Sequence, residues 1–370
     1  MKKNILFLIT NLEHGGAERV LVNLVNNLDK SKYNITLKTI FDTGINKRYL
    51  SSDVNYDFVF SKTFHGIKFI TKFLPANVLH RLFIKNKYDI EIAYLEGPPA
   101  KIISGCKNKK TKKLAWIHIE LNNKKIFKEG FFSFLDAVKS YKKFDKIVCV
   151  SQSVKDIFQN ISGNTNTIVK YNTNETEKIR KLSEEKVSDI SVSYNYPIIC
   201  SVAKIEYSKG YDRLIEVHKR LIDEGYKHKI YVVGTGSEEE CLKKRISDLG
   251  IIDSFVFLGF RENPYKYIKM SDLYICSSRR EGFSTAVTES LILGTPVIST
   301  DCSGARELLG YNNEYGIVVQ NSTEGIYEGI KMLLGNPDLI NDYKERVGKR
   351  GNMFSINKTI KEIEEMLDVL

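Results

Sequence analysis

The sequence predicts an α/β protein made of two doubly wound domains. About a dozen short apolar, β-branched runs alternate with helix-like amphipathic segments along the 370 residues. Such alternation is typical of parallel sheets with helices on both faces. Because so many strands exceed what one doubly wound domain of this length holds, we expect two domains, each with its own sheet.

The predicted strands are spread evenly over the two halves of the chain. In the first half they are Ile5–Ile9, Ile35–Phe41, Ile90–Leu95, Leu114–Ile117, Ile147–Val150 and Ile168–Tyr171. In the second half they are Ile198–Val202, Ile230–Val233, Phe255–Leu258, Leu273–Cys276, Val297–Ser299 and Ile317–Val319. Segments such as Ala17–Leu28 and Tyr211–Ile222 have helical apolar spacing.

A polar stretch near the middle of the chain, rich in Glu, Lys, Ser and Asn, predicts the connection between the domains. We therefore expect a Rossmann-like domain over 1–172, a linker over 173–195 and a second Rossmann-like domain over 196–350. Doubly wound sheets bind ligands at the carboxyl ends of their strands. The two domains are expected to face a central cleft at those ends.

The net charge of +11 is concentrated in the first half of the sequence. Residues 1–190 carry 33 Lys and Arg against 19 Asp and Glu, whereas residues 191–370 carry 23 against 26. A basic first domain indicates an anionic partner, such as nucleic acid, a membrane surface or a phosphorylated ligand. A generally Lys-rich composition is the alternative, but it would make both halves basic.

The cysteines and the apolar runs indicate the cellular compartment. Six scattered cysteines without a Cys-x-x-Cys pair favour reduced, buried thiols and argue against a zinc site. The apolar run Ile5–Ile9 is too short for the core of a signal peptide. No run approaches the roughly 18 apolar residues of a membrane span. We therefore expect a cytoplasmic protein.

The segment 280–298 is the most informative part of the sequence. Glu281 lies in the turn after a predicted strand, and Glu289 lies about one turn into the predicted helix Ala286–Leu293. Two carboxylates at the carboxyl end of a parallel strand can accept hydrogen bonds from ligand hydroxyls. The alternative is that both side chains are ordinary solvated residues.

The same turn has the features of an anion site. Gly282 permits the backbone to bend, and Ser284 or Thr285 can cap the helix. The free N–H groups at a helix start bind phosphate. Carboxylates that bind hydroxyls, beside N–H groups that bind phosphate, suit a sugar nucleotide.

Glycine pairs follow two other predicted strands. Gly15-Gly16 follows the first strand, and Gly234 and Gly236 follow the second strand of the second half. Glycine at a strand end lets backbone N–H groups approach a phosphate closely. The alternative in both places is an ordinary tight turn.

Charged and polar side chains also follow strands on either side. Lys204 and Lys209 lie between the first strand of the second half and its helix, where they could neutralise a diphosphate leaving group. His118 follows a strand of the first half and could position a sugar hydroxyl or the leaving phosphate. Solvated lysines and a core histidine are the alternatives.

Three segments of the first half, 68–75, 79–85 and 124–134, interleave aromatic and apolar residues with basic ones. This composition is typical of a contact with an anionic membrane surface. Core helices with basic outer faces are the alternative.

Together these residues resemble the retaining glycosyltransferases of the GT4 family, which have the GT-B fold. The matching features occur in the family's order and span nearly the whole chain. They are Gly15-Gly16, His118, Lys204 with Lys209-Gly210, Gly234-Thr235-Gly236, and Glu281 with Glu289 followed by Gly294-Thr295-Pro296-Val297. The resemblance also implies that residues 351–370 form a helix that crosses back to the first domain.

The resemblance assigns roles to these residues. It implies that Glu281 contacts the donor sugar, that the backbone of Phe283–Thr285 meets the donor, and that Glu289 holds the ribose. Lys204 and Lys209 would hold the diphosphate. Many relatives have Arg at the position of Lys204; lysine offers a point charge in place of the forked guanidinium of arginine. The predicted catalytic residues are His118, Lys204, Lys209 and Glu281. The predicted donor-binding residues are Gly15, Gly16, Gly234, Gly236, Phe283, Ser284, Thr285 and Glu289.

The predicted activity is the transfer of a hexose or N-acetylhexosamine from a nucleotide sugar with retention of configuration. The expected nucleotide is UDP, and the expected acceptor is a hydroxyl of a lipid-linked glycan or an oligosaccharide. Capsule, exopolysaccharide, O-antigen or glycoprotein glycan synthesis would be the setting, at the inner face of the cell membrane. We expect no metal, no other cofactor and no nucleic acid partner. A non-catalytic GT-B scaffold, a sugar-nucleotide epimerase and a periplasmic sugar-binding protein are the alternatives.

Overall fold

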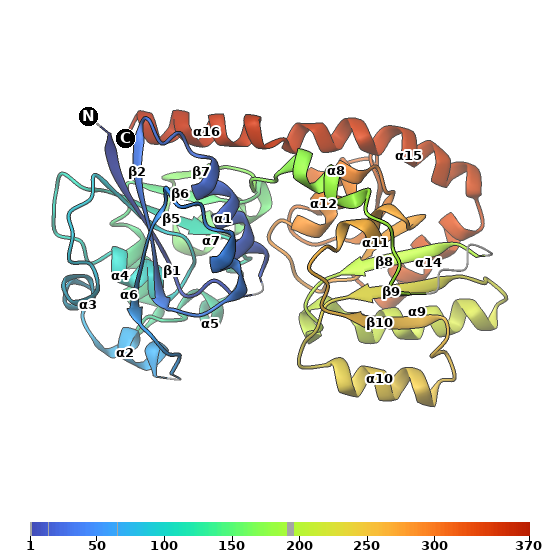
Figure 1. Cartoon of the computed structure of the whole chain (residues 1–370). Helices are drawn as coiled ribbons and strands as arrows, with labels where there is room; N and C mark the ends of the chain where they lie inside the picture. The colour runs from blue at the N-terminus through green and yellow to red at the C-terminus, as the bar shows by residue number, and fades with distance from the viewer. Residues whose placement is uncertain (1, 14, 65, 191–195) are drawn as a thin grey trace. The chain divides into compact units, whose positions relative to one another are not determined.

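The computed structural model describes the chain except for residues 1, 14, 65 and 191–195. It divides into two compact units (Figure 1). Unit 1 comprises Met1–Thr173 and Asn357–Leu370, and unit 2 comprises Asn174–Ile356. Each unit contains one parallel sheet with helices, which confirms the predicted α/β class.

Unit 1 has a seven-stranded sheet in the order β3-β2-β1-β4-β5-β6-β7. The strands are β1 (Lys3–Ile9), β2 (Tyr33–Phe41), β3 (Asn55–Phe60), β4 (Ile90–Ala93), β5 (Lys112–Ile117), β6 (Lys146–Cys149) and β7 (Thr167–Val169). The helices are α1 (Gly16–Asn27), η1 (Ile45–Tyr49), α2 (Ile67–Phe73), α3 (Ala76–Phe83), α4 (Pro98–Ile103), α5 (Lys124–Phe127), α6 (Phe134–Tyr141), α7 (Gln152–Ser162) and most of α16 (Ile356–Asp368).

Unit 2 has a six-stranded sheet in the order β10-β9-β8-β11-β12-β13. The strands are β8 (Ile198–Val202), β9 (Lys229–Val233), β10 (Phe255–Gly259), β11 (Leu273–Cys276), β12 (Val297–Thr300) and β13 (Ile317–Val319). The helices are α8 (Thr176–Ser183), η2 (Tyr207–Lys209), α9 (Tyr211–Asp223), α10 (Glu239–Asp248), α11 (Tyr265–Lys269), α12 (Thr285–Leu293), α13 (Ala305–Leu309), α14 (Thr323–Leu334), α15 (Pro337–Gly351) and η3 (Asn352–Phe354).

Each sheet has one point at which its strand order reverses direction. The candidate site lies at this point. In unit 1 the central strand β1 pairs with β2 on one side and β4 on the other. In unit 2, β8 pairs with β9 and β11 in the same way. The loops after the two strands of such a reversal diverge to opposite faces of the sheet, and ligands bind in the crevice between them.

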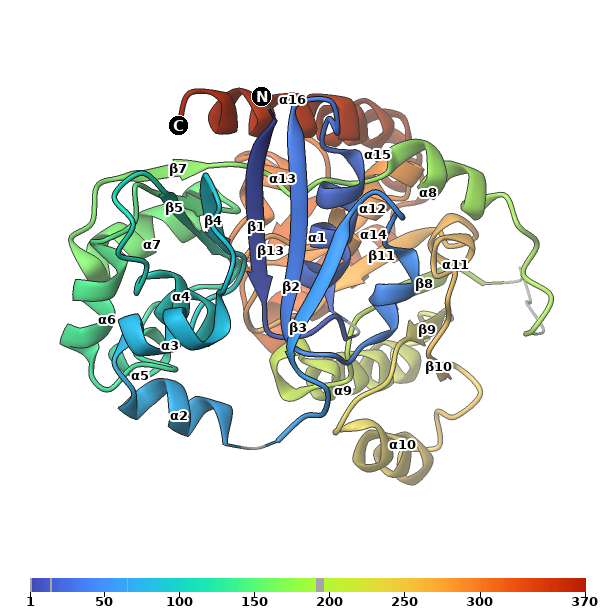
Figure 2. The same ribbon diagram turned by 60° about the vertical axis from the view of Figure 1, so that its left-hand side comes forward.

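Every strand of the two sheets except β3 was predicted from the sequence. In Figure 2, β3 lies beside β2 at the outer edge of the sheet of unit 1. None of its residues is buried, because only one neighbouring strand covers it. An edge strand of this kind has no continuous apolar run, so the pattern that identified the other strands is missing.

The segment predicted as the linker, 173–195, contains the helix α8. This helix packs against α11 and α12 in unit 2. Asn263 fixes its end by donating hydrogen bonds to the Leu182 carbonyl (2.8 Å) and to Glu185 Oε2 (2.9 Å). The boundary between the units falls at residues 173 and 174. The polar outer face of this short helix gives the segment a composition like that of a linker. Residues 191–195 of the predicted linker lie outside the described residues.

The last helix, α16, joins unit 1 although the chain reaches it from unit 2. Tyr33 donates a hydrogen bond to Asp368 Oδ1 (2.5 Å), and Lys3 Nζ donates one to the Leu367 carbonyl (2.8 Å). The backbone N–H of Asp29 donates to Glu364 Oε1 (2.8 Å). These bonds attach α16 to the amino ends of β1 and β2; the helix begins at Ile356, within the range 351–370 that was predicted for it.

A pair of buried histidines links α9 to the sheet of unit 2. His218 Nδ1 lies 2.8 Å from His228 Nε2, and His218 Nε2 lies 2.8 Å from Ser254 Oγ. Burial lowers the pKa of His218 to about 3 and that of His228 to about 4. Both imidazoles are therefore neutral in the folded protein near neutral pH.

This pair predicts that the protein loses stability in mild acid. Each histidine has an ordinary pKa near 6.5 once unfolded, so the unfolded chain binds more protons as pH falls from about 6.5 to 4. Between pH 7 and 5 the pair should lower the free energy of unfolding by roughly 4 kcal/mol. Urea unfolding at both pH values should show that the His218→Gln/His228→Gln variant loses correspondingly less. An equal loss in variant and wild type would contradict the assignment.

Candidate active site

The strand reversal of unit 2 brings the loops after β8 and β11 into close contact. Gly210, at the end of the first loop, has φ +69°, and a Cβ there would lie 2.2 Å from the carbonyl oxygen of Ser277. Only glycine fits, because a side chain would collide with that backbone. The contact therefore holds Lys209 and the start of α9 directly against the loop that carries Glu281.

Arg279 also joins these two loops, although the sequence analysis did not identify it. Its guanidinium binds both carboxylate oxygens of Asp212, at 2.7 and 2.6 Å. The backbone N–H of Arg279 donates to the carbonyl of Ser208 (2.7 Å). A bidentate pair of this type fixes orientation as well as distance. The only sequence signal was a basic residue just after a strand.

The predicted residues Lys209 and Glu281 form an ion pair in this contact. Lys209 Nζ lies 2.7 Å from Glu281 Oε1, and Ser278 Oγ donates to the same oxygen at 2.6 Å. The side chains are 22% and 15% exposed. Burial alone would lower the pKa of Lys209, but the Glu281 carboxylate raises it above its ordinary value. Ser278, which the sequence analysis missed, therefore helps to orient the carboxylate.

The helix α12 begins three residues after Gly282 and carries Glu289. As expected, Ser284 caps it by accepting a hydrogen bond from the N–H of Val287 (3.4 Å). Glu289 is 9% exposed, and Tyr265 Oη lies 3.4 Å from its Oε1. The structure thus places this second carboxylate on the helix whose N-terminus follows the loop of Glu281.

The side chain of Phe283 belongs to the core of unit 2. It is 5% exposed, and its ring packs edge-on against Phe354 at 5.8 Å. Gly304, at φ +77°, lies so close that a Cβ would be 2.9 Å from the carbonyl oxygen of Gly282. Any donor contact of Phe283 would therefore have to come from its backbone; donor binding by Phe283–Thr285 stays a prediction.

Gly234 and Gly236 pack the loop after β9 onto the loop after β8. A Cβ on Gly234 would lie 2.0 Å from the carbonyl oxygen of Ala203, and one on Gly236 would lie 2.2 Å from that of Ile205. Both glycines are therefore required by close backbone contact. Donor binding by these residues stays a prediction.

Lys204 differs from Lys209 in its surroundings. Its side chain is exposed, and within the described residues it makes no ion pair with a carboxylate. Its loop is nevertheless fixed, because Ile205 N–H donates to the Thr235 carbonyl (2.9 Å). Of the two predicted diphosphate ligands, one is held by a carboxylate and the other extends into solvent.

In unit 1 the glycine pair lies at the start of a helix, as predicted. Gly16 is the first residue of α1, and Gly15 is its N-cap, with extended backbone. A Cβ on Gly15 would lie 1.9 Å from Glu18 Oε2. A side chain at Gly15 would therefore displace Glu18 and cover the N-terminus of α1, which follows the central strand β1.

His118 follows β5 and is buried with an unused hydrogen-bonding atom. It is 8% exposed, and its ring packs on Tyr94 with centroids 4.7 Å apart. Burial lowers the pKa of His118 to about 3. Its Nε2 has no hydrogen-bond partner among the described residues. A neutral imidazole with a free ring nitrogen can accept or donate one hydrogen bond to a ligand.

Glu96 holds the segment that carries His118 in place. Its Oε1 accepts hydrogen bonds from the backbone N–H groups of His118 and Ile119, the latter at 3.0 Å. Burial raises the pKa of Glu96 to about 7. The sequence analysis missed this residue, although a carboxylate directly after the predicted strand Ile90–Leu95 was a usable signal.

The chain resembles known glycosyltransferases in sequence and in structure. Residues 183–351 match the family model of glycosyl transferases group 1. Over 99% of its length the chain is 25% identical to the whole of a Haemophilus influenzae protein named uncharacterized glycosyltransferase. It is also similar to the N-acetylgalactosamine-N,N'-diacetylbacillosaminyl-diphospho-undecaprenol 4-alpha-N-acetylgalactosaminyltransferase of Campylobacter jejuni, with 31% identity over 58% of this chain and 57% of that protein.

Among solved structures, the fold matches HepE of Anabaena in complex with UDP, with a TM-score of 0.78 and 18% identity over the full length of both chains. This similarity identifies the two parallel sheets as the GT-B fold. The family match covers nearly all of unit 2, including Lys204, Lys209, Glu281 and Glu289. The comparisons thus relate residues 183–351 to glycosyl transferases group 1 and support a glycosyltransferase of the hexosyltransferase class.

Proposed function

We propose that the enzyme transfers a hexose or N-acetylhexosamine from a UDP-sugar to a hydroxyl of a lipid-linked glycan, with retention of configuration. The observation that carries the proposal is the ion pair of Lys209 and Glu281 at the strand reversal of unit 2. The UDP bound to HepE supports the choice of nucleotide. The diphospho-undecaprenol in the name of the Campylobacter jejuni relative supports a lipid-linked acceptor in surface-glycan or glycoprotein synthesis.

The two carboxylates would bind different parts of the donor. Lys209 and Ser278 both bind Oε1 of Glu281, so we assign Oε2 to the hydroxyls of the donor sugar. Glu289, at 9% exposure, would accept hydrogen bonds from the ribose. A carboxylate that accepts from two neighbouring hydroxyls orients the sugar as well as binding it.

Positive groups would stabilise the diphosphate as it leaves. Lys204 is exposed, Lys209 remains charged beside Glu281, and the N–H groups at the start of α12 add a partial positive charge. Charge that is fixed where a negative charge develops lowers the barrier without reorganisation. We therefore propose that the reaction needs no metal ion and no other cofactor.

The chemical step would follow from these contacts. The bond between the anomeric carbon and the diphosphate breaks through an oxocarbenium-like state, and its electron pair stays on the phosphate oxygen. The acceptor hydroxyl attacks the same face of the sugar, and the leaving phosphate takes its proton. The neutral imidazole of His118 would hold a sugar hydroxyl or the leaving phosphate through Nε2.

An exposed aromatic patch on unit 1, formed by Phe69, Phe73 and Phe132, supports binding to a membrane surface. These side chains are 66%, 52% and 60% exposed. Phe73 packs on Phe69 at 4.5 Å and on Phe132 at 6.1 Å, and Lys72 Nζ lies 5.6 Å from the Phe73 ring. Exposed rings beside cations suit the headgroup region of anionic lipid. This exposure disfavours the alternative of core helices.

No helix in the described parts of the chain has the length and apolar composition needed to cross a membrane. We propose that the enzyme is cytoplasmic and binds the inner face of the cell membrane through the aromatic patch and the basic residues of unit 1. A membrane-bound glycan acceptor would then be concentrated at the same surface.

Glu289→Gln should weaken donor binding about tenfold or more, because a hydrogen bond to a charged acceptor is worth roughly 1.5–3 kcal/mol. Thermal unfolding of the wild type with UDP, GDP, CDP, ADP or TDP should show stabilisation by one nucleotide. At 100 times its Kd this ligand should add about 2.7 kcal/mol.

The matched control is Glu240→Gln, whose side chain is 90% exposed on α10. It should respond to the nucleotide like the wild type. Stabilisation that persists unchanged in Glu289→Gln would refute the ribose assignment. If no nucleotide stabilises the wild type, the scaffold alternative gains, and product formed from the donor without acceptor would instead favour an epimerase.

Lys204→Met should fold normally, because the side chain is exposed, yet it should bind the diphosphate less well. Loss of one charge-assisted hydrogen bond predicts a roughly 10- to 150-fold fall in kcat/KM for the nucleotide sugar. Steady-state kinetics of the variant test this, with Lys243→Met on α10 as the control. Equal kcat/KM in the Lys204 variant and the wild type would remove Lys204 from the site.

The protein should co-sediment with vesicles that contain anionic lipid, more strongly at low salt than at high salt. Replacing Phe69, Phe73 and Phe132 with Ser should reduce this binding severalfold. Substituting Ser for the exposed Tyr311 and Met332 of unit 2 should not. A wild-type protein that stays in the supernatant at low salt would argue for a soluble acceptor.

A further inference from the structure

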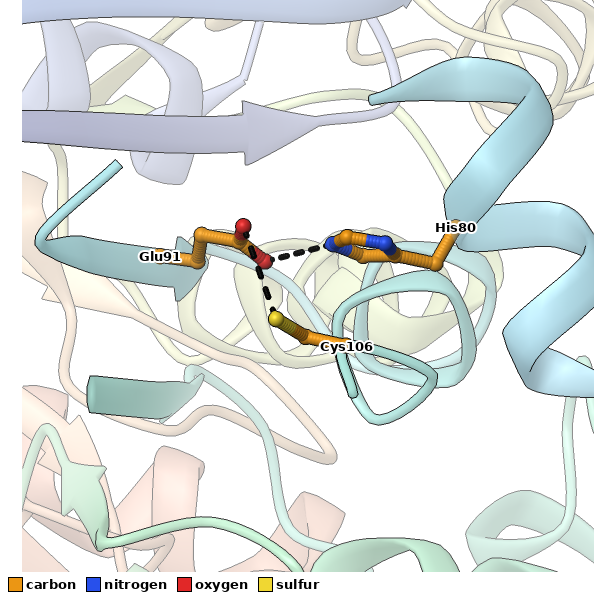
Figure 3. A group of neighbouring side chains, drawn as sticks. All are labelled: His80, Glu91 and Cys106. Carbon is orange, nitrogen blue, oxygen red and sulfur yellow. Dashed lines mark hydrogen bonds and ion pairs between the residues drawn. The ribbon is translucent and has the colours of Figure 1, made fainter. Parts of the chain in front are cut away.

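Three side chains that bind transition metals meet in unit 1 (Figure 3). His80 comes from α3, Glu91 from β4 and Cys106 from the turn after α4. One ligand atom from each lies within 4.8 Å of the other two. His80 Nε2 is 2.8 Å from Glu91 Oε2, and Cys106 Sγ is 3.7 Å from Glu91 Oε1. All three side chains therefore converge on one point.

This point lies at the opposite end of the parallel strands from His118. Glu91 is the second residue of β4, so its side chain is near the amino end of the parallel strands, whereas His118 follows the carboxyl end of β5. The cluster is thus separate from the residues assigned to glycosyl transfer, and the inference does not depend on the proposed function.

The backbone around the cluster is built to bring Cys106 close. A Cβ on Gly105 would lie 1.9 Å from the carbonyl oxygen of Ala76, so only glycine lets the turn after α4 pack on the start of α3. The helices α3 and α4 pack against each other along this contact. Cys106 therefore reaches the same side of β4 as His80.

Burial makes an isolated carboxylate costly here. Glu91 is 2% exposed and Cys106 is 8% exposed, and the His80 side chain is 15% exposed. A buried carboxylate requires a cationic partner or a metal. Thiolate, imidazole and carboxylate are the three ligand types that bind Zn²⁺, and one thiolate with one carboxylate balances its two charges.

We propose that His80, Glu91 and Cys106 bind a zinc ion. Tetrahedral zinc places N and O ligands about 3.4 Å apart and S and O ligands about 3.6 Å apart. The observed separation of Cys106 Sγ and Glu91 Oε1 is 3.7 Å, and that of His80 Nε2 and Glu91 Oε2 is 2.8 Å. The two distances end on different oxygens of Glu91, so admitting the ion would take a rotation of the carboxylate that turns one oxygen toward both partners, together with opening the His80 contact by about half an ångström.

The fourth ligand position would face a cavity. The three residues line a pocket of about 400 Å³. A water molecule occupies about 30 Å³ in the liquid, so the cavity holds one with room to exchange. Its other charged lining residues are Arg81, Lys85, Lys87 and Lys107. Their positive charge opposes a free cation, so binding of the ion would depend on the opposite charges of the Cys106 thiolate and the Glu91 carboxylate.

Cobalt(II) is the probe for this site, because a cobalt–thiolate bond gives a charge-transfer absorption band. The full-length protein, freed of metal with a chelator, should bind one cobalt ion per chain with this band, and zinc should displace it. Cys106→Ser should abolish the band. His80→Gln should weaken cobalt binding at least about 10- to 100-fold, the loss that even an outer partner of a ligand produces.

The matched control is Cys241→Ser, which removes an exposed thiol on α10 and should leave the band unchanged. Far-ultraviolet circular dichroism and cooperative thermal unfolding report the fold of each variant. If Cys106→Ser does not fold, His80→Gln decides the question. A wild type without the band, or a band that survives in a folded Cys106→Ser variant, would overturn the proposal and leave His80 and Glu91 as an ion pair.

Discussion

The close contact between the loops after β8 and β11 is the constraint on which the candidate site depends. Two backbones meet at Gly210 and Ser277, where no Cβ fits. This contact holds Lys209 against Glu281 and aims both at the strand reversal of the sheet. Because the pair is mostly buried and Glu281 also accepts a hydrogen bond from Ser278, its geometry is fixed before a ligand arrives. Binding energy then need not be spent on ordering these groups.

Unit 1 uses burial in a different way. His118 is kept neutral and partly unsatisfied, and Glu96 holds its backbone from the neighbouring strand end. A buried ring nitrogen without a partner is unfavourable in the free protein, and a ligand that supplies the missing hydrogen bond recovers that free energy. At the strand ends of this unit the imidazole of His118 is thus neutral, whereas those of unit 2 carry a charged pair.

Most of the fold was predictable because strong local signals coincide with burial. Central strands such as Ile5–Ile9 are 0% exposed at every residue, so they read as continuous apolar runs. The cap Ser284 and the helix that follows were predictable for the same reason of local chemistry. The edge strand β3 and the helix α8 were not, because each has a polar exposed face and lacks a continuous apolar run.

The sequence by itself determined the α/β class, the two sheets and the residues at their carboxyl edges, since strand periodicity and glycine-rich turns are local properties. Only the tertiary structure decided which of those residues meet. The pairing of Lys209 with Glu281 depends on the order of β8 and β11 in the sheet. The convergence of His80, Glu91 and Cys106 depends on the packing of α3 and α4. Residues separated along the chain without a fixed spacing leave no motif, so the contact exists only once the backbone has folded.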